Sequence, residues 1–391
     1  MAERLPAADW TQRADLAALI AALDPESQGL CRYVGGAVRD TLLGLTVADI
    51  DIATQLLPDE VLARLKAAGI KAVPTGLAHG TITAVIAGGP AEITTLRRDV
   101  STDGRHATVA FSSDWQEDAA RRDFTINALS ADPRDLSIHD YFGGLADLTA
   151  RRVRFIGAAE ARIAEDYLRI LRYFRFQARF GSLPADAEAE AACARLAPGM
   201  KGLSRERIGW ELLNLLGLPD PAATAQRMAQ LGVLAQILPE ADPAPLPALI
   251  AAEQRAAAAP DALRRLAAML PPDPDLAGLV GARLRLSINQ RKRLALAVVR
   301  AEPDANARAL AYQVGREAAS DRLLIAGGDL APLAGWEVPR FPLKGGAIVA
   351  RGISAGPDVA RILRAVESRW VAEGFPDAAR LGDLLGEELT A

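Results

Sequence analysis

The spacing of hydrophobic positions changes near residue 155, and this change divides the chain into two kinds of structure. Before it, short apolar runs alternate with glycine-containing turns. The stretch "TITAVIAGGPAEITTLR", from Thr81 to Arg97, predicts two strands joined by a Gly-Gly-Pro turn. After it, apolar residues recur at helical spacing, as at Tyr167, Leu171 and Phe174. The pattern therefore predicts an α+β part with a mixed sheet and helices, followed by a long all-α part.

Three short elements of the α+β part bring glycines, an arginine and aspartates close together in sequence. A strand is predicted over "RYVGG", a helix over "GAVRDTLLG" and a strand over "DIDIAT". An amphipathic helix follows in "PDEVLARLKAAG", with Pro58 near its start and Gly69 at its end. The candidate chemistry therefore lies on two strands and the helix that connects them.

Two aspartates, Asp49 and Asp51, occupy alternate positions of the second of these strands. Residues two apart in a strand share a face, so we expect the two carboxylates side by side, with Ile50 and Ile52 buried on the opposite face. Adjacent carboxylates repel unless a cation lies between them, and Mg²⁺ suits such oxygen ligands together with substrate phosphates. Metal ions held in this way can activate an attacking hydroxyl and stabilise a leaving pyrophosphate. The alternative is an acidic pair on a solvated strand, which is more common for so short a motif.

The glycine pair before the helix is suited to a phosphate group. Gly35 and Gly36 let backbone amides approach a ligand closely, and the positive end of the following helix points outward. Arg39, in the first turn of that helix, can add a guanidinium to a triphosphate. Taken alone, the pair is better explained as an ordinary glycine-rich helix entry, and its spacing does not match the dinucleotide-binding fingerprint. The order of strand, glycine pair, arginine-bearing helix and acidic strand is what favours a nucleotide site.

This order of motifs resembles the head of the class II tRNA nucleotidyltransferases and bacterial poly(A) polymerases, members of the polymerase β-like nucleotidyltransferase superfamily. Further stretches match the family in the expected order: "EITTLRRDVSTDGRHA", "RRDFTINAL", "EDYLRILRYFRF" and "LSRERIGWEL". The similarity covers about residues 30 to 215 and rests on several independent motifs. The later stretch "PLKGGAIVARGISAGPDVARIL" is similar to a weaker tail pattern, but has Ala347 where family members often carry aspartate.

The resemblance implies roles for several further residues. Glu92 would join the two aspartates as a third catalytic acid, and Arg105 would lie in a mobile loop that helps relatives switch from cytosine to adenine addition. Arg122 would contact phosphate or sugar, with Asp123 and Asn127 as supports. Without the resemblance, Glu92 is an exposed strand residue, and the group around Arg122 is a helix start stabilised by charge.

Selection of the nucleotide is implied for the stretch around Asp166 and Arg169, which we expect three apart on one helix. Cytosine and adenine both present an amine donor beside a ring-nitrogen acceptor. A carboxylate accepts from the amine and a guanidinium donates to the ring nitrogen, whereas uracil and guanine present the opposite pattern. Arg172 and Arg175 would stabilise this pair or meet phosphate. The alternative is a salt bridge on a solvated helix face.

The resemblance and the change in pattern together imply four regions. They are an N-terminal helical segment, 1–29; a catalytic head, 30–150; a helical neck that selects the nucleotide, 151–215; and a helical body and tail that bind tRNA, 216–391. The densest basic cluster of the body contains Arg283, Arg285, Arg291, Lys292, Arg293 and Arg300. These cations are expected either to meet RNA phosphates or to form a solvated helix face.

Composition and charge serve only to exclude some classes of protein and some kinds of site. With 391 residues, a net charge of −4 and a pI of about 5.6, the chain has no global basic signature of nucleic-acid binding, although a local arginine stripe can serve instead. Two cysteines argue against a disulfide framework or a cysteine-rich zinc site. We find neither a secretory signal nor an apolar run long enough to cross a bilayer, so a cytoplasmic protein is expected.

The expected function is template-independent addition of CCA to the 3′ end of tRNA, with CTP and ATP as substrates, Mg²⁺ as the cofactor and release of pyrophosphate. The alternatives on the same scaffold are a poly(A) polymerase and an enzyme that adds only part of the CCA end. A third alternative, from another functional class, is a catalytically inactive module that binds RNA or nucleotide. The Asp49 and Asp51 pair argues against that module, because simple binding needs no metal pair.

Overall fold

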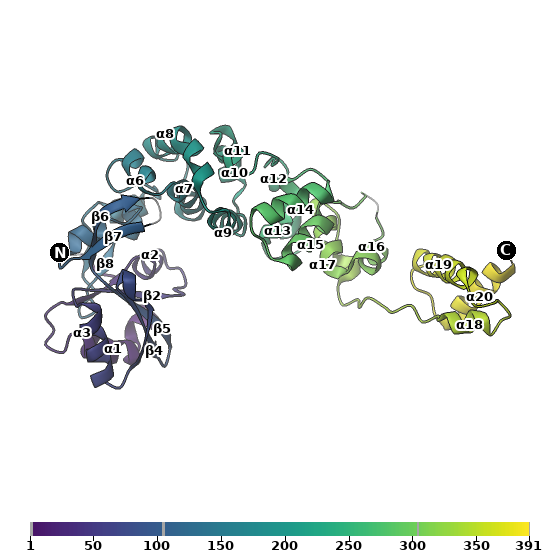
Figure 1. Ribbon diagram of the computed structural model, residues 1–391, viewed down its shortest axis with the longest axis horizontal. Helices are drawn as coiled ribbons and strands as arrows, with labels where there is room; N and C mark the ends of the chain where they lie inside the picture. Colours follow the sequence, from purple (N-terminus) through teal and green to yellow (C-terminus); the bar gives the residue numbers. More distant parts are fainter. Residues whose placement is uncertain (1–2, 104–105, 303–304, 391) are drawn as a thin grey trace. The chain divides into compact units, whose positions relative to one another are not determined.

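The chain forms two compact units (Figure 1). The computed structural model describes residues 3–103, 106–302 and 305–390. The first unit comprises Met1–Glu211 and Gln230–Ile237, and the second comprises Leu212–Ala229 and Leu238–Ala391. Among the described residues, every strand lies in the first unit. The α+β part and the all-α part that the hydrophobic pattern predicts are therefore both present.

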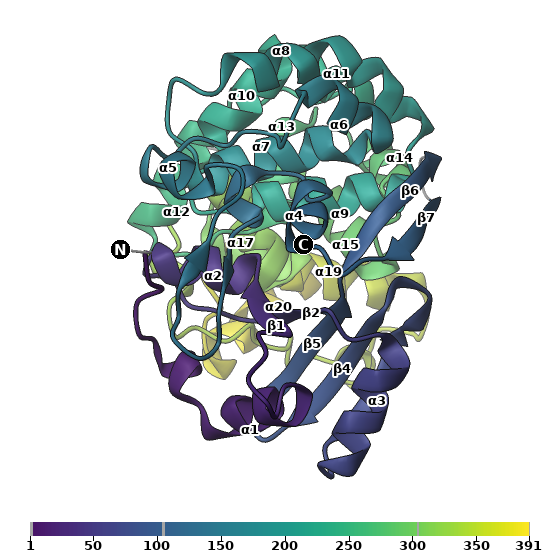
Figure 2. The same cartoon turned by 90° about the vertical axis from the view of Figure 1, so that its left-hand side faces the viewer.

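A mixed sheet of seven strands forms the framework of the first unit. Its strands are β1 (Cys31–Val34), β2 (Ile50–Thr54), β3 (Lys71–Gly76), β4 (Thr81–Ile86), β5 (Gly89–Thr95), β8 (Ser130–Ala131) and β9 (Ile138–His139). They follow the order β3–β4–β5–β2–β1–β8–β9, and in this described sheet only the β2–β5 pair is parallel. Figure 2 shows β2, β5 and β4 side by side. A separate two-stranded ribbon consists of β6 (Arg97–Asp103) and β7 (His106–Phe111).

One face of the sheet is apolar because strand alternation places its isoleucines together. The predicted hairpin joins β4 to β5, where Ile82 pairs with Ile93, and Ile93 in turn pairs with Ile52 of β2. All three are fully buried. Helices α1 (Ala14–Leu23) and α3 (Pro58–Ala67) contact each other and β4, and Pro58, predicted near the start of its helix, is the first residue of α3. The alternate residues of β2 and β5 therefore belong to the opposite face.

The first unit contains further helices besides α1 and α3. They are α2 (Gly36–Leu42), α4 (Trp115–Ala120), α5 (Gly144–Thr149), α6 (Ala159–Glu165), α7 (Leu168–Phe180), α8 (Ala187–Leu196), the start of α9 (Arg205–Leu216) and α11 (Val233–Ile237). Aromatic side chains of α7 pack against aromatic side chains that precede it in the chain. Phe155 lies 5.7 Å from Tyr173 and 5.0 Å from Phe124, and Phe124 lies 5.1 Å from Phe176, between ring centroids. This packing holds the polar side of α7, with its arginines, in a fixed orientation.

The second unit is helical throughout its described length. Its helices are α10 (Ala222–Gln230), α12 (Leu246–Arg255), α13 (Ala262–Met269), α14 (Pro274–Arg283), α15 (Ile288–Ala297), α16 (Ala307–Val314), α17 (Arg316–Ile325), α18 (Gly345–Val349), α19 (Pro357–Ala372) and α20 (Ala378–Thr390). Charge is buried among them: Arg265, 1% exposed, donates to Glu253 and to the carbonyl of Leu216 at the end of α9. No helix in the described parts of the chain is long and apolar enough to span a membrane.

Several members of the basic cluster in the body serve the helical packing. Arg283 forms a two-point ion pair with Glu240, and Arg293 pairs with Asp261 and Asp321. Arg300 donates to backbone carbonyls of α13 and its end. These contacts favour a structural role for the three arginines. Arg285 and Lys292 are exposed and remain the members of the cluster best placed to meet an RNA phosphate.

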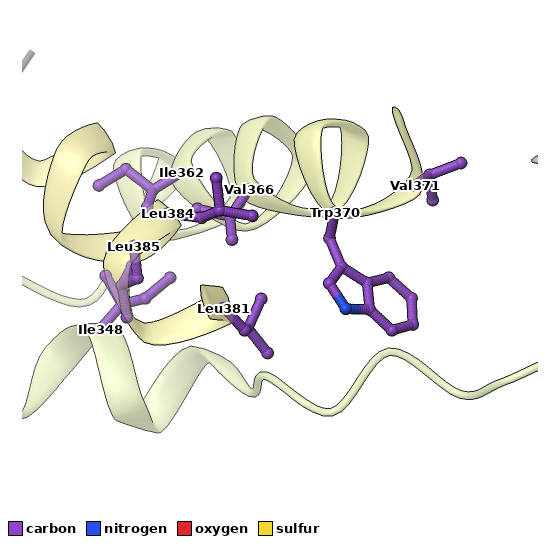
Figure 3. Close-up of a cluster of buried hydrophobic side chains, with 8 residues drawn as sticks. All are labelled: Ile348, Ile362, Val366, Trp370, Val371, Leu381, Leu384 and Leu385. Atoms are coloured by element: carbon purple, nitrogen blue, oxygen red, sulfur yellow. The ribbon is translucent and has the colours of Figure 1, made fainter. Parts of the chain in front are cut away.

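The C-terminal helices α18, α19 and α20 have a hydrophobic cluster of their own. Its buried side chains are Ile348, Ile362, Val366, Trp370, Val371, Leu381, Leu384 and Leu385 (Figure 3). The indole nitrogen of Trp370 donates to the carbonyl of Pro376 at 2.8 Å, and the Phe375 and Phe341 rings pack against the indole. Ala347, where the tail pattern of the family often has aspartate, is exposed on α18.

Candidate active site

A cavity of about 600 Å³ in the first unit collects most of the residues that the sequence singles out. The predicted residues that line it are Gly35, Gly36, Arg39, Asp51, Glu92, Arg122, Asp123, Asn127, Asp166, Arg169 and Arg172. Asp49 and Arg175 are not part of the lining, and Arg105 lies outside the described residues. Residues far apart in the sequence therefore meet in one hollow, with strands on one side and α7 on the other.

The acidic side of the cavity comes from the parallel β2–β5 pair. Asp51 is paired in register with Glu92, so both carboxylates stand on the face opposite the buried Ile50 and Ile52. Burial, and then the Glu92 carboxylate, raise the pKa of Asp51 above its ordinary value. Asp49 also contributes to this rise and therefore lies nearby. The strand begins only at Ile50, so its geometry fixes Asp51, whereas Asp49 is an exposed residue of the preceding loop.

This acidic edge suits a divalent cation without enclosing one. Among the described residues, no group of three or more histidine, cysteine, aspartate or glutamate side chains is arranged to hold a metal ion by itself. Mg²⁺ does not need such an enclosure, because it retains waters and takes one or two carboxylates together with substrate phosphates. The donors Asp51 and Glu92 are both oxygen ligands, and their mutual repulsion favours a cation beside them. The residues present therefore fit a divalent ion that is completed by substrate.

The glycine turn lies beside the acids, at the start of α2. Gly35 has φ of +64°, a conformation that other residues rarely adopt, and a Cβ there would lie 3.1 Å from Nη1 of Arg122. Gly36 begins the helix. Both features require a small residue at this turn and leave the backbone accessible from the cavity. The sequence prediction that the pair serves close approach to a ligand agrees with this position.

Arg39 lines the cavity but is held from several sides. Its guanidinium is buried, pairs with Asp40 at 2.6 Å, donates to Oδ1 of Asn127 and lies 4.2 Å from the ring centroid of Phe180. Burial lowers the pKa of Arg39, although Asp40 opposes the shift. Arg39 therefore holds Asn127, another residue of the cavity lining, and also adds positive charge to the cavity.

Charged hydrogen bonds connect Asn127 to α7, and a further one connects α7 to α9. Asn127 donates to Asp123 at 2.9 Å, and Asp123 accepts from Nε of Arg172 at 2.8 Å. Arg175 donates from Nε to Glu211 of α9 at 2.6 Å. Burial opposes ionisation of Asp123, but Arg172 and Asn127 outweigh it and lower the pKa of Asp123. The supporting role that the resemblance implies for Asp123 and Asn127 is consistent with these contacts.

We expect Asp123→Ala to lower the free energy of unfolding by about 2 kcal/mol at pH 7. This is less than the ~3–5 kcal/mol for breaking a fully buried pair, because the Arg172 side chain is 33% exposed. A carboxylate whose pKa is lowered in the folded state stabilises it above the unfolded value of about 3.9, and this stabilisation is lost as the pH falls through the folded pKa. Urea denaturation of both proteins from pH 7 to pH 3 should show the difference shrinking. An equal difference at all pH values would contradict the assignment.

Asp166 and Arg169 both line the cavity, but the prediction that they share one helix is wrong. Helix α6 ends at Glu165 and α7 begins at Leu168, while Asp166 between them is extended, with φ of −156°. Its carboxylate accepts from the Leu168 amide at 3.1 Å, which satisfies a free donor at the start of α7 and explains the break. Arg169 donates to Glu165, so the alternative of a salt bridge between Asp166 and Arg169 is wrong as well.

Two residues of α9 that matter to the cavity were not singled out from the sequence. Arg207 lines the cavity and forms an ion pair with Asp166. Glu211, four residues later, is only 1% exposed and receives Arg175. Both belong to the stretch "LSRERIGWEL", whose helical spacing places them on one face. That spacing was the available signal, but it does not say which helix the face contacts.

The arrangement can bind a nucleoside triphosphate and present it to a nucleophile. The cavity lining combines the carboxylates of Asp51 and Glu92 with guanidiniums that include those of Arg122 and Arg172. The phosphates of a triphosphate fit between them, with a divalent ion on the acidic side. The Asp166 carboxylate and the Arg169 guanidinium lie in the same cavity and can read the edge of a base. Fold and cavity together define a nucleotidyltransferase head.

Comparison with known proteins agrees with this class. The Poly A polymerase head domain family matches residues 31–154, and the family described as the probable RNA and SrmB-binding site of polymerase A matches residues 185–244. The mitochondrial CCA tRNA nucleotidyltransferase 1 of Mus musculus is 36% identical over 382 residues, which cover 88% of this chain and 83% of that protein. The human protein of the same name gives the same percentages over 386 residues. The chain therefore belongs to the class II CCA tRNA nucleotidyltransferase family.

Solved structures show the same fold along nearly the whole chain. The CCA-adding enzyme of Bacillus stearothermophilus in complex with CTP gives a TM-score of 0.72 at 26% identity, covering 96% of this chain and 97% of that one. The CCA-adding enzyme of Thermotoga maritima complexed with tRNA gives 0.70 at 22% identity, covering 96% of this chain and 94% of that one. The prediction of an α+β head followed by helical regions is therefore confirmed.

Proposed function

We propose that this protein adds CCA to the 3′ end of tRNA without a nucleic-acid template, using CTP and ATP and releasing pyrophosphate. The observation that carries the proposal is the meeting of the Asp51–Glu92 edge with Asp166 and Arg169 in one cavity. A triphosphate site and a base-reading pair are both needed for such a reaction. The relatives named as CCA tRNA nucleotidyltransferases, similar along most of the chain, support the choice of substrate.

In the proposed reaction the primer 3′-hydroxyl attacks the α-phosphorus, a new phosphodiester bond forms, and the bond to the bridging oxygen of pyrophosphate breaks. Asp51 and Glu92, with the neighbouring Asp49, would hold Mg²⁺, which supplies charge neutralisation and makes the attacking hydroxyl more acidic. Arg122 and Arg172, which line the same cavity, would bind phosphate oxygens, and the Gly35 turn lets the backbone approach them. These groups orient the triphosphate before the attack.

Selection of C and A follows from the edge of the base that faces the cavity. Asp166 would accept a hydrogen bond from the exocyclic amine, and Arg169 would donate to the ring nitrogen. Arg207 fixes the Asp166 carboxylate and Glu165 fixes Arg169, so the two groups are oriented before a nucleotide enters. Uracil or guanine would set an acceptor against the Asp166 carboxylate and a donor against the Arg169 guanidinium, which is costly. Arg175, held by Glu211, would support α7.

We infer that the regions divide the work along the chain. The head, residues 30–150, would carry the chemistry, the neck, 151–215, would select the nucleotide, and the body and tail, 216–391, would hold tRNA. The cavity residues, which run from Val34 to Arg207, support the first two assignments, and the RNA-binding family match at residues 185–244 supports RNA binding by the end of the neck and the start of the body. Some relatives are named as mitochondrial, and the cytoplasmic compartment stays a prediction.

The direct test offers tRNA that lacks its last three nucleotides to the protein with Mg²⁺ and each nucleoside triphosphate. CTP alone should add two residues, CTP with ATP three, and UTP or GTP none. Omission of the divalent ion, with EDTA present, should stop incorporation. The product lengths are read on a sequencing gel.

Each other product pattern identifies an alternative. Long adenosine tails on the same RNA would indicate a poly(A) polymerase, and growth that stops after cytidines or requires a preformed CC end would indicate a partial enzyme. A folded protein that binds tRNA and adds nothing would be the inactive module.

A further inference from the structure

Trp210 is a largely exposed aromatic side chain on α9, the helix that also carries the cavity residue Arg207. It is 58% exposed, whereas the other tryptophans of the chain, Trp10, Trp115, Trp336 and Trp370, are buried or half-buried. On α9 it lies three residues after Arg207, so the two side chains are neighbours on the helix surface. Arg207 lines the cavity, so Trp210 lies close to it along α9, although Trp210 is not itself part of the lining.

The indole is held in place by the charged network of the site. Arg175 donates to Glu211 at 2.6 Å, and its guanidinium carbon lies 5.6 Å from the centroid of the Trp210 ring. The same carbon lies 4.8 Å from the ring of Phe176, which lines the cavity. Arg175 therefore contacts both a ring of the cavity lining and the Trp210 ring. An aromatic ring fixed in this way presents its surface to a ligand with little loss of conformational entropy.

Further arginines lie on α7 and α9, the two helices that carry Arg175 and this ring, and each of them is ion-paired with a carboxylate. The side chains of Arg172 and Arg207 are each 33% exposed, and that of Arg179 is 40% exposed. Guanidiniums interleaved with an aromatic ring can bind the phosphates of a strand while an unpaired base stacks on the ring. A tryptophan that served only the core would be largely buried.

We propose that Trp210 stacks on the unpaired base at the 3′ end of the RNA strand that is being extended. The inference rests on the proposed function, because that function places an RNA end beside the triphosphate. The incoming base is assigned to Asp166 and Arg169 inside the cavity. Trp210, on the helix that also carries the cavity residue Arg207, would meet the adjacent base, which is the last one already joined to the RNA. The stacked base brings its ribose, and so the attacking hydroxyl, into register with the α-phosphorus.

The test compares Trp210→Ala with Trp210→Phe, which keeps an aromatic face. The alanine variant should raise the KM for tRNA lacking CCA roughly tenfold, as expected for loss of one stacked base, with the KM for CTP unchanged. The phenylalanine variant should recover most of this loss. Leu57→Ala, which removes a side chain that is 48% exposed in the same unit, is the matched control and should leave both values unchanged.

A second RNA, abasic at its 3′-terminal nucleotide, separates stacking from a structural effect. With wild-type protein this RNA should show a raised KM, and Trp210→Ala should add nothing further to it, because residue and base act as one pair. If Trp210→Ala had the same effect on both RNAs, or none on either, the stacking proposal would be wrong. A wild-type protein that incorporates no nucleotide would instead overturn the proposed function.

Discussion

Asp51→Asn should abolish nucleotide addition and at the same time raise the temperature at which the protein unfolds. The loss of activity follows from the removal of a charge that would hold the divalent ion against the triphosphate. Such ions supply several kcal/mol of charge stabilisation in the transition state, so we expect a fall in the single-turnover rate of about 10³-fold or more. Asparagine keeps the shape of the side chain, so the cavity should persist.

The gain in stability has a separate cause. Burial and the Glu92 carboxylate raise the pKa of Asp51, which means that its ionised form is less favourable in the folded than in the unfolded chain. Without metal, this ionised group therefore costs stability above its folded pKa. The cost disappears as the pH falls below the unfolded value of about 3.9. A neutral asparagine avoids it, so the difference in melting temperature should be greatest at neutral pH in EDTA and should shrink in acid.

Asp49→Asn is the informative comparison for this prediction. Asp49 is exposed in the loop before β2 and does not line the cavity, so its removal should change the melting temperature little. If it also shares the divalent ion, as the sequence motif predicts, activity should fall with Asp49→Asn too. Retention of activity within tenfold of wild type by Asp51→Asn would contradict the metal assignment, whatever the melting curve shows.

Local sequence signals predicted much of the framework because they depend on residues near one another in the chain. The alternation of Ile50 and Ile52 with Asp51 gave both the strand and its buried face. The Gly-Gly-Pro turn gave the β4–β5 hairpin, and the apolar spacing of Leu171 and Phe174 gave the helix α7. Each of these patterns lies within a short stretch of sequence and can be recognised without knowing which element that stretch packs against.

The site was less predictable where it depends on contacts between distant segments. The ion pair between Asp166 and Arg207 joins residues 41 positions apart, and no local pattern shows which helix α9 faces. The break before α7 was missed because the Asp166 side chain accepts from the backbone amide of Leu168, whereas periodicity alone continues the helix across this point. Parallel pairing likewise placed Glu92 beside Asp51, a register that spacing cannot supply. The family resemblance implied that Glu92 joins the aspartates, but it assigned no role to Arg207.

Asp166→Ala should reduce the ability of the protein to tell CTP and ATP from UTP and GTP. A site built to pair with an amine and a ring nitrogen rejects bases of the opposite pattern by roughly 10⁴-fold, and the carboxylate supplies half of that pattern. Its loss should lower kcat/KM for CTP and ATP and bring all four nucleotides within about 10²-fold of one another. The measurement is the rate of single incorporation into tRNA lacking CCA for each triphosphate. Glu206→Ala, which removes an exposed carboxylate beside Arg207, is the matched control and should keep full selectivity.

The Asp166→Asn variant separates the charge of this residue from its hydrogen-bonding pattern. An asparagine amide can accept from the amine of C or A through its oxygen, or donate to the carbonyl of U or G through its nitrogen. It should therefore improve UTP and GTP more than alanine does, while Arg169 still opposes their ring N–H. The ion pair with Arg207 is lost in both variants, so a merely structural role of that pair would affect them equally and leave the order of the four nucleotides unchanged. Unchanged order in both variants would remove Asp166 from nucleotide selection.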